Sequence, residues 1–211
     1  QAEALAGKLK NGLVTAAKVG SLAVSAAATG ISVLTKRSIE SYGEYEQLVG
    51  GVETLFKQSA DAVMGYAENA YKTAGMSANE YMTTVTSFSA SLLQSMGGDT
   101  AAAAEKANLA ITDMSDNANK MGTDMELIQN AYRGFAKSNY SMLDNLALGY
   151  GGTKEEMERL LADAEKLSGI KYDISSYSDI VDAIHVVQTE MGITGTTAKE
   201  ASTTIQGSVS A

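Results

Sequence analysis

Residues 77–97 read SANEYMTTVTSFSASLLQSMG, and this stretch carries the signals of one complete helix. Ser77 and Glu80 form a capping box, in which each side chain accepts a hydrogen bond from a free backbone N–H group at the helix start. Apolar side chains then recur at the three- and four-residue spacing of a helix face. They are Tyr81, Val85, Phe88, Leu92 and Met96. Because glycine commonly follows the last residue of a helix, Gly97 predicts its end, and we expect a helix over residues 77–96.

The same start and stop signals recur along the chain. Further capping boxes are predicted at Thr123 with Glu126, Thr153 with Glu156, and Thr197 with Glu200. Further helix ends are predicted at Gly75, Gly122, Gly169 and Gly192. No segment shows the alternating pattern of a half-buried strand. We therefore predict helices near residues 59–74, 77–96, 100–121, 124–138, 154–168, 178–191 and 198–206.

Residues 1–42 differ from the rest. Small side chains at Ala16, Gly20, Ala23 and Ala27 share one helix face, and such a face allows a second helix to approach closely. Internal glycines cost about 1 kcal/mol each relative to alanine, so this helix needs a partner from its own chain or from a neighbouring copy. We predict an all-α fold, in which a long N-terminal helical arm (residues 1–42) precedes a compact multi-helix bundle of short capped helices (residues 43–211).

The composition narrows the functional classes. The chain has 211 residues, a net charge of −9, no proline and no cysteine. The negative charge argues against specific nucleic-acid binding, which normally relies on basic side chains that neutralise phosphates. Without cysteine there are no disulfides or thiolate metal sites, which favours folding in a reducing compartment. The chain starts at Gln1 rather than methionine, so we expect it to be an excerpt of a longer protein.

Residues 19–35 carry no charge, which raises the question of membrane insertion. The run is slightly shorter than a spanning helix requires. It also contains hydroxyl side chains, among them Ser21, Ser25, Thr29 and Ser32. We favour burial of this run against another helix.

No catalytic constellation is evident. His185 is the only histidine, and its place beside an apolar stripe favours a position on the flank of a helix. Asp113, Asp116 and Asn117 resemble scattered calcium ligands, but they lie within a helical pattern and lack the spacing of a calcium-binding loop. The glycines of Gly149–Gly152 follow no predicted strand, so we interpret them as a structural turn rather than a phosphate loop. We predict no enzymatic activity, cofactor or metal, and we place most methionines in the core.

Several segments are distinctive beyond their helical pattern. They are YEQLVGGVETLF (45–56), KTAGMSANEYM (72–82), DMSDNANKMGTDM (113–125), LDNL (143–146) leading into GYGGTK (149–154), and GITGTTAKEA (192–201). They are distributed along residues 45–208. These segments resemble tail tape measure proteins from phages and prophages of Gram-positive bacteria.

The resemblance implies a structural virion protein that is made in the bacterial cytoplasm and threaded along the tail lumen. Its implied partners are other copies of itself, tail tube and tail-tip proteins, and tail assembly chaperones. Members of this family set the tail length and leave ahead of the DNA during genome ejection. As one helix, 211 residues would span only about 320 Å, less than many tails need. Since the predicted caps also break the chain into short helices, we expect a compact domain of a longer tape measure chain.

Two alternatives stay open beside this structural role. One is a membrane-active translocation module that inserts residues 19–35 through a transient membrane contact. The other is a helical interaction domain unrelated to phages. Some family members carry a peptidoglycan hydrolase elsewhere in the chain, but the single histidine argues against an enzyme here.

Overall fold

The computed structural model of the chain describes residues 43–209, and every regular element in this range is helical. This confirms the predicted all-α class. Residues 43–56 are helical and lead into the short 3₁₀ helix η1 (Lys57–Ser59). The following elements are α3 (Ala60–Thr73), α4 (Ala78–Ser95), α5 (Thr100–Met121), α6 (Met125–Phe135), the 3₁₀ helix η2 (Leu143–Leu146), α7 (Lys154–Ser168), α8 (Tyr177–Glu190) and α9 (Thr196–Val209). The predicted arm, with Ala16, Gly20, Ala23 and Ala27, lies outside the described residues.

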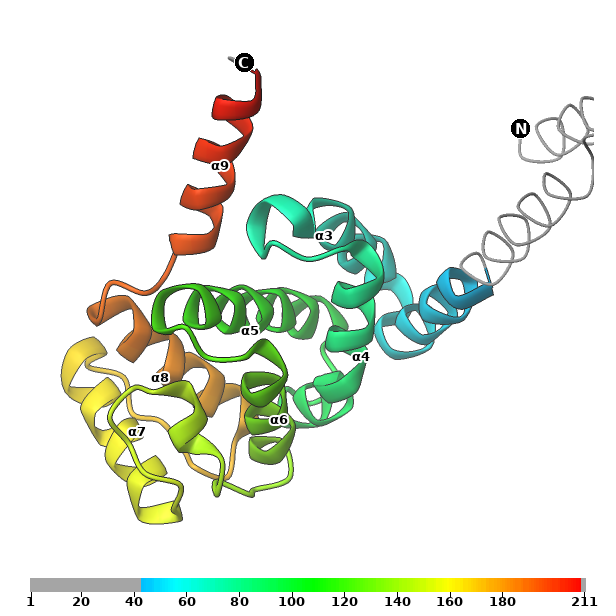
Figure 1. Cartoon of the computed structure of the whole chain (residues 1–211). Coiled ribbons are helices and arrows are strands. Elements are labelled where there is room, and N and C mark those ends of the chain that lie inside the picture. The colour runs from blue at the N-terminus through cyan, green and yellow to red at the C-terminus, as the bar shows by residue number, and fades with distance from the viewer. Residues whose placement is uncertain (1–42, 210–211) are drawn as a thin grey trace, which may run out of the picture. The chain divides into compact units, whose positions relative to one another are not determined.

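Helix α5 is the centre of the bundle. It contacts α3, α4, α6, α8 and α9, whereas α7 packs mainly against α8 (Figure 1). Its first half is rich in alanine, and the side chains of Ala103, Ala104, Ala107 and Ala110 are all buried. Because alanine adds little width to a helix, several neighbours can approach α5 closely from different sides. Larger side chains, among them Phe56, Tyr81, Tyr132 and Phe135, complete the core.

The helix bounds agree closely with the sequence pattern. The predicted ranges 100–121 and 154–168 are the bounds of α5 and α7, and the other predicted starts fall within two residues of those observed. The helix over residues 43–56 was not predicted, and α9 extends to Val209 rather than to 206. Helix α6 instead ends early, at Phe135 rather than at 138. There the carbonyl of Gly134 accepts hydrogen bonds from the N–H groups of Lys137 and Asn139. These bonds close a turn, with Ser138 in the left-handed region at φ 56°, and the turn stops the helix.

The predicted caps have mixed outcomes. The Ser77–Glu80 capping box is present, with both reciprocal hydrogen bonds. Thr153 caps α7 as predicted, although the Glu156 carboxylate accepts from the N–H of Gly151 instead of completing the box. The box predicted at Thr123 is wrong, because Asp124 caps α6. Asp124 stands one residue closer to the helix than Thr123, and its carboxylate accepts from the N–H group of Glu126.

Most methionines lie in the core or pack against it, as predicted. Met121 and Met191 are the exceptions, with 37% and 44% of their surface exposed. Leu167, which continues the apolar stripe of α7, is also 48% exposed. Each of these three residues stands at the end of its helix. An apolar stripe therefore predicts burial along a helix better than it predicts burial in the last turn.

Among the described helices, none combines the length and the apolar composition needed to cross a membrane. The uncharged run at residues 19–35 lies outside the described residues.

Candidate functional site

The second half of α5 carries a strip of polar side chains that is buried. Asp113, Asp116 and Asn117 are at most 1% exposed, and Ser115 is 8% exposed. A polar group loses its hydrogen bonds to water on burial, so it is stable there only with protein partners. Their hydrogen-bond partners lie on several other elements. The strip therefore links α5 to the segments that surround it.

Asp116 caps helix α9 from within the core. Its carboxylate accepts hydrogen bonds from the backbone N–H groups of Gly195 at 2.6 Å and of Thr197 at 2.8 Å. A negative charge at a helix N-terminus also complements the helix dipole. This contact corrects the predicted capping box at Thr197, which lies inside α9 with its N–H group already bonded to α5. The cap of α9 thus comes from α5, which is distant in the sequence, rather than from the residues next to α9.

Two neighbours of Asp116 extend this connection. The Ser115 hydroxyl donates to the carbonyl of Ala74 at 2.6 Å and lies 3.3 Å from the Thr197 hydroxyl. One turn further along α5, the Asn119 amide donates to the Glu200 carboxylate at 2.6 Å. The turn between α3 and α4 is therefore joined to the start of α9 through side chains of α5.

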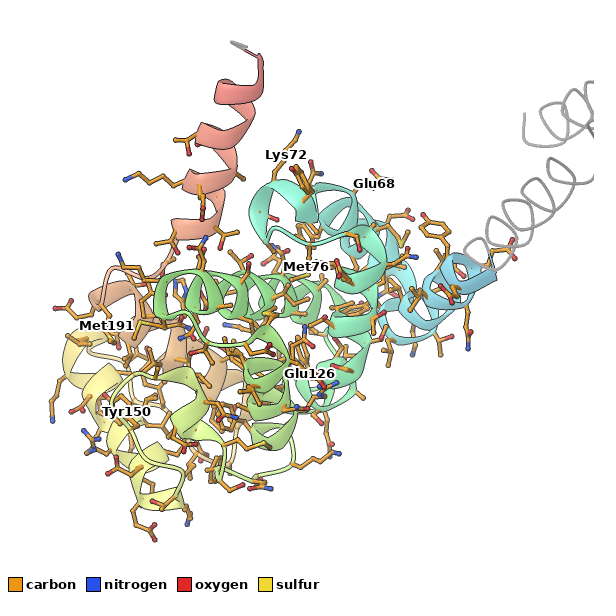
Figure 2. The ribbon with its side chains drawn as sticks, viewed as in Figure 1. Glu68, Lys72, Met76, Glu126, Tyr150 and Met191 are labelled. Atoms are coloured by element: carbon orange, nitrogen blue, oxygen red, sulfur yellow. The ribbon has the colours of Figure 1, made fainter. Side chains whose placement is uncertain are left out.

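A groove of about 600 Å³ opens above this junction, where α3, α4, α5, α6 and α9 meet. Its apolar lining consists of Tyr71, Ala74, Met76, Ala118, Met125 and Ala201. Tyr71 is 65% exposed at its border. The carboxylates of Glu80 and Glu200 also line it, and the described lining holds no basic side chain. Figure 2 shows Met76 near the turn between α3 and α4, on a different part of the bundle from Met191 at the end of α8.

The groove brings together segments that the sequence analysis singled out separately. Residues 72–82, 113–125 and 192–201 each contribute to the lining, and the hydrogen bonds of Ser115 and Asp116 hold them together. The predicted helix–helix interface at Ala16, Gly20, Ala23 and Ala27 lies outside the described residues, and no pattern in the sequence indicates that the three segments form one groove. The available signal was the run of polar residues at 113–117 inside a helical pattern, because such residues become buried only where other elements converge on them.

His185 lies on α8 with its side chain 30% exposed, in keeping with the predicted flank position. Its Nδ1 atom is 2.9 Å and 3.0 Å from the two carboxylate oxygens of the buried Asp113. Beside this contact, Lys106 of α5 forms an ion pair with Asp182 of α8. No hydroxyl or amine nucleophile is hydrogen-bonded to His185 among the described residues. The geometry therefore fastens α8 to α5 and does not assemble a catalytic triad.

The charge states of this pair are coupled to folding. Burial raises the pKa of the Asp113 carboxyl, and the contact with His185 opposes that rise. The hydrogen bond to Asp113 raises the pKa of His185 above its ordinary value of 6.5, while burial and Lys106 act in the opposite direction. Both upward shifts mean that the folded chain holds protons more tightly than the unfolded chain does. The nearby charges are Asp116 and Lys106 on α5 and Asp182 on α8.

We expect the free energy of unfolding to fall as the pH rises above about 6.5, the ordinary pKa of histidine. The stabilisation from His185 is complete below its unfolded pKa of about 6.5 and is lost as the pH passes the raised folded value. Urea unfolding curves across this pH range measure the effect.

Asp113→Asn keeps the shape of the side chain and removes its charge, so the slope with pH should become shallower. Asp182→Asn is the matched control, because it removes a carboxylate from the same cluster and leaves the contact between Asp113 and His185 in place. Carboxyls whose pKa is lowered, such as Glu80 through its hydrogen bonds with Ser77, titrate below this range. An unchanged slope in Asp113→Asn would show that the pair does not cause the pH dependence.

In residues 43–209, no cluster of three or more histidine, aspartate and glutamate side chains is arranged to hold a metal ion. Asp113, Asp116 and Asn117, which resemble calcium ligands in the sequence, are instead bonded to His185, to the start of α9 and to the carbonyl of Leu146. Comparison with known proteins gives no match to a protein-family model, a curated protein or a solved structure.

Proposed function

We propose that this chain is a structural, non-enzymatic domain of a phage tail tape measure protein that acts through assembly contacts. The observation that carries the proposal is the convergence of residues 72–82, 113–125 and 192–201 on one groove. These are three of the segments in which the sequence resembles that family. Segments far apart in the chain form a single surface here, as expected of a site that binds a partner.

The properties of the groove support a protein contact. Its lining is largely apolar, and its volume of about 600 Å³ can accept several side chains of a partner helix. Partners in the proposed role are tail tube and tail-tip proteins, tail assembly chaperones and other copies of the chain, with the tail lumen as the final location. In this role the domain contributes to tail assembly, tail-length determination and genome ejection, and it anchors a longer ruler rather than acting as the ruler.

Tail length tests the proposal in a virus that carries in-frame deletions in this gene. We expect tails to shorten by about 1.5 Å for each residue deleted in helical regions outside this domain, because this is the rise of an α-helix. Electron micrographs of purified particles give the length. Tails of unchanged length in every deletion would contradict the tape measure role.

Substitutions within the domain separate an assembly role from a measuring role. Met125→Glu places a charge in the groove, whereas Met191→Glu places the same charge on an exposed methionine outside it. We expect fewer assembled tails with Met125→Glu and normal numbers with Met191→Glu, with normal length in the tails that do form.

The membrane-active alternative depends on residues 19–35, and liposome flotation of the chain tests it separately. Binding to vesicles at neutral or acidic pH that is lost on deletion of this run would favour the alternative. An absence of binding under both conditions would count against it.

A further inference from the structure

We infer that the groove binds the N-terminal segment of a second copy of this chain, with Ala16, Gly20, Ala23 and Ala27 turned into it. This inference deepens the proposed function and rests on it for the view that the groove is an assembly surface. It names one occupant among the partners considered above, and it joins two features of the chain that otherwise have no common explanation.

Residues 1–42 and the rest of the chain carry net charges of opposite sign. Residues 1–42 contain five basic and two acidic side chains, which gives a net charge of +3. The remaining residues contain 11 basic and 23 acidic side chains, which gives −12. Two acidic domains repel each other, whereas the basic segment of one copy is attracted to the acidic domain of another. The carboxylates of Glu80 and Glu200 in the groove lining have the sign that this attraction requires.

Several polar side chains of the groove lining are already hydrogen-bonded within the domain. The Glu80 carboxylate accepts hydrogen bonds from the backbone and hydroxyl of Ser77. The Gln129 amide donates to Thr84, and the Asn119 amide donates to Glu200. Because these groups already have partners within the domain, the groove suits an apolar guest better than a polar ligand such as a nucleotide. Its two carboxylates also disfavour phosphate.

The small residues of the N-terminal segment match such a surface. Their positions, at intervals of four, three and four residues, are those that a helix uses to contact a groove along one face. Small side chains allow the guest backbone to come close, and the methionines at 76 and 125 can adapt their shape around it. The groove lies between α5 and α9, so the guest would pack beside both helices.

Cross-linking between two single-cysteine variants tests the contact, because the chain has no cysteine of its own. One full-length chain carries Ala23→Cys and the other carries Met125→Cys. We expect the mixture to form a disulfide-linked dimer at least about tenfold faster than either variant alone, since bound chains hold the two thiols at a high effective concentration. Met191→Cys replaces Met125→Cys in the matched control, and we expect no such dimer.

A double variant with Ala23→Cys and Met125→Cys in one chain tests whether the groove binds the N-terminal segment of its own chain or that of a second copy. An internal disulfide that forms at low concentration, without dimer in the mixture, would show that the groove binds its own segment and would overturn the inference. Equal cross-linking at Met125→Cys and Met191→Cys would overturn it as well. Circular dichroism shows whether each variant is folded before it is compared.

Sedimentation of the full chain gives a second measurement that needs no cysteine. Met125→Glu is expected to weaken self-association about tenfold, whereas Met191→Glu leaves it unchanged. An equal effect of the two substitutions would overturn the inference. The tail-length experiment tests the proposed function separately from this contact. Tail length can shorten with each deletion even if this contact does not form, and the contact can form even if tail length stays unchanged.

Discussion

Replacing Asp116 with alanine is expected to lower the free energy of unfolding by about 3 kcal/mol or more. The substitution removes the acceptor for the N–H groups of Gly195 and Thr197 at the start of α9. Since Asp116 is fully buried, water cannot easily replace the lost carboxylate. Urea unfolding measures the loss. Hydrogen exchange should show that protection falls first in residues 195–200, because this turn loses its cap.

Asp124→Ala is the matched control, because Asp124 also caps a helix but does so locally and at the surface. It accepts one hydrogen bond, from the N–H of Glu126 at 2.8 Å. Loss of such a cap typically costs about 1 kcal/mol. Asp116→Asn, which keeps one acceptor oxygen, should fall between the two alanine variants. Equal losses for Asp116→Ala and Asp124→Ala would mean that the connection between α5 and α9 contributes nothing beyond an ordinary cap.

The contrast between these caps shows which parts of the fold the sequence could predict. Ser77 and Glu80 are three residues apart, so their pairing depends only on local geometry and could be predicted. Gly122 and Gly169 end their helices in the left-handed conformation, which is also a local property. The cap of α9 comes from a residue about 80 positions away, and a local pattern suggested Thr197 and Glu200 instead.

The candidate site was harder to predict for the same reason. An apolar stripe shows which face of a helix is buried when the opposite face meets water. Helix α5 is surrounded by other helices, so Asp113, Asp116 and Asn117 are buried as well, and no periodic pattern indicates this. The partner of Asp113 is His185, 72 positions along the chain. Only the packing of α8 against α5 brings the two together.

A second large effect is expected at Gly152, where alanine should cost about 3 kcal/mol or more, or prevent folding. A Cβ atom at this position would lie 2.2 Å from the carbonyl oxygen of Ser141 and 2.9 Å from its carbonyl carbon. Both are backbone atoms, so a change of side-chain rotamer cannot relieve the clash. The segment that would have to move leads directly into η2, whose Leu143 and Leu146 are buried. Thermal or urea unfolding measures the loss.

Alanine variants at the neighbouring glycines show whether stability is lost through a steric clash or through backbone strain. At Gly151 a Cβ atom would make only an ordinary contact, 3.5 Å from Glu156, so Gly151→Ala should change stability little. Gly149 has open space around it but a φ of 84°, and strain alone should cost about 1 kcal/mol in Gly149→Ala. Similar losses of stability at all three positions would contradict a close approach between the backbones of Gly152 and Ser141. We expect the largest loss of stability at Gly152, a smaller one at Gly149 and the smallest at Gly151. This order would show that close backbone packing requires glycine at 152 and that the positive φ favours it at 149, so that both glycines have a structural role in the turn.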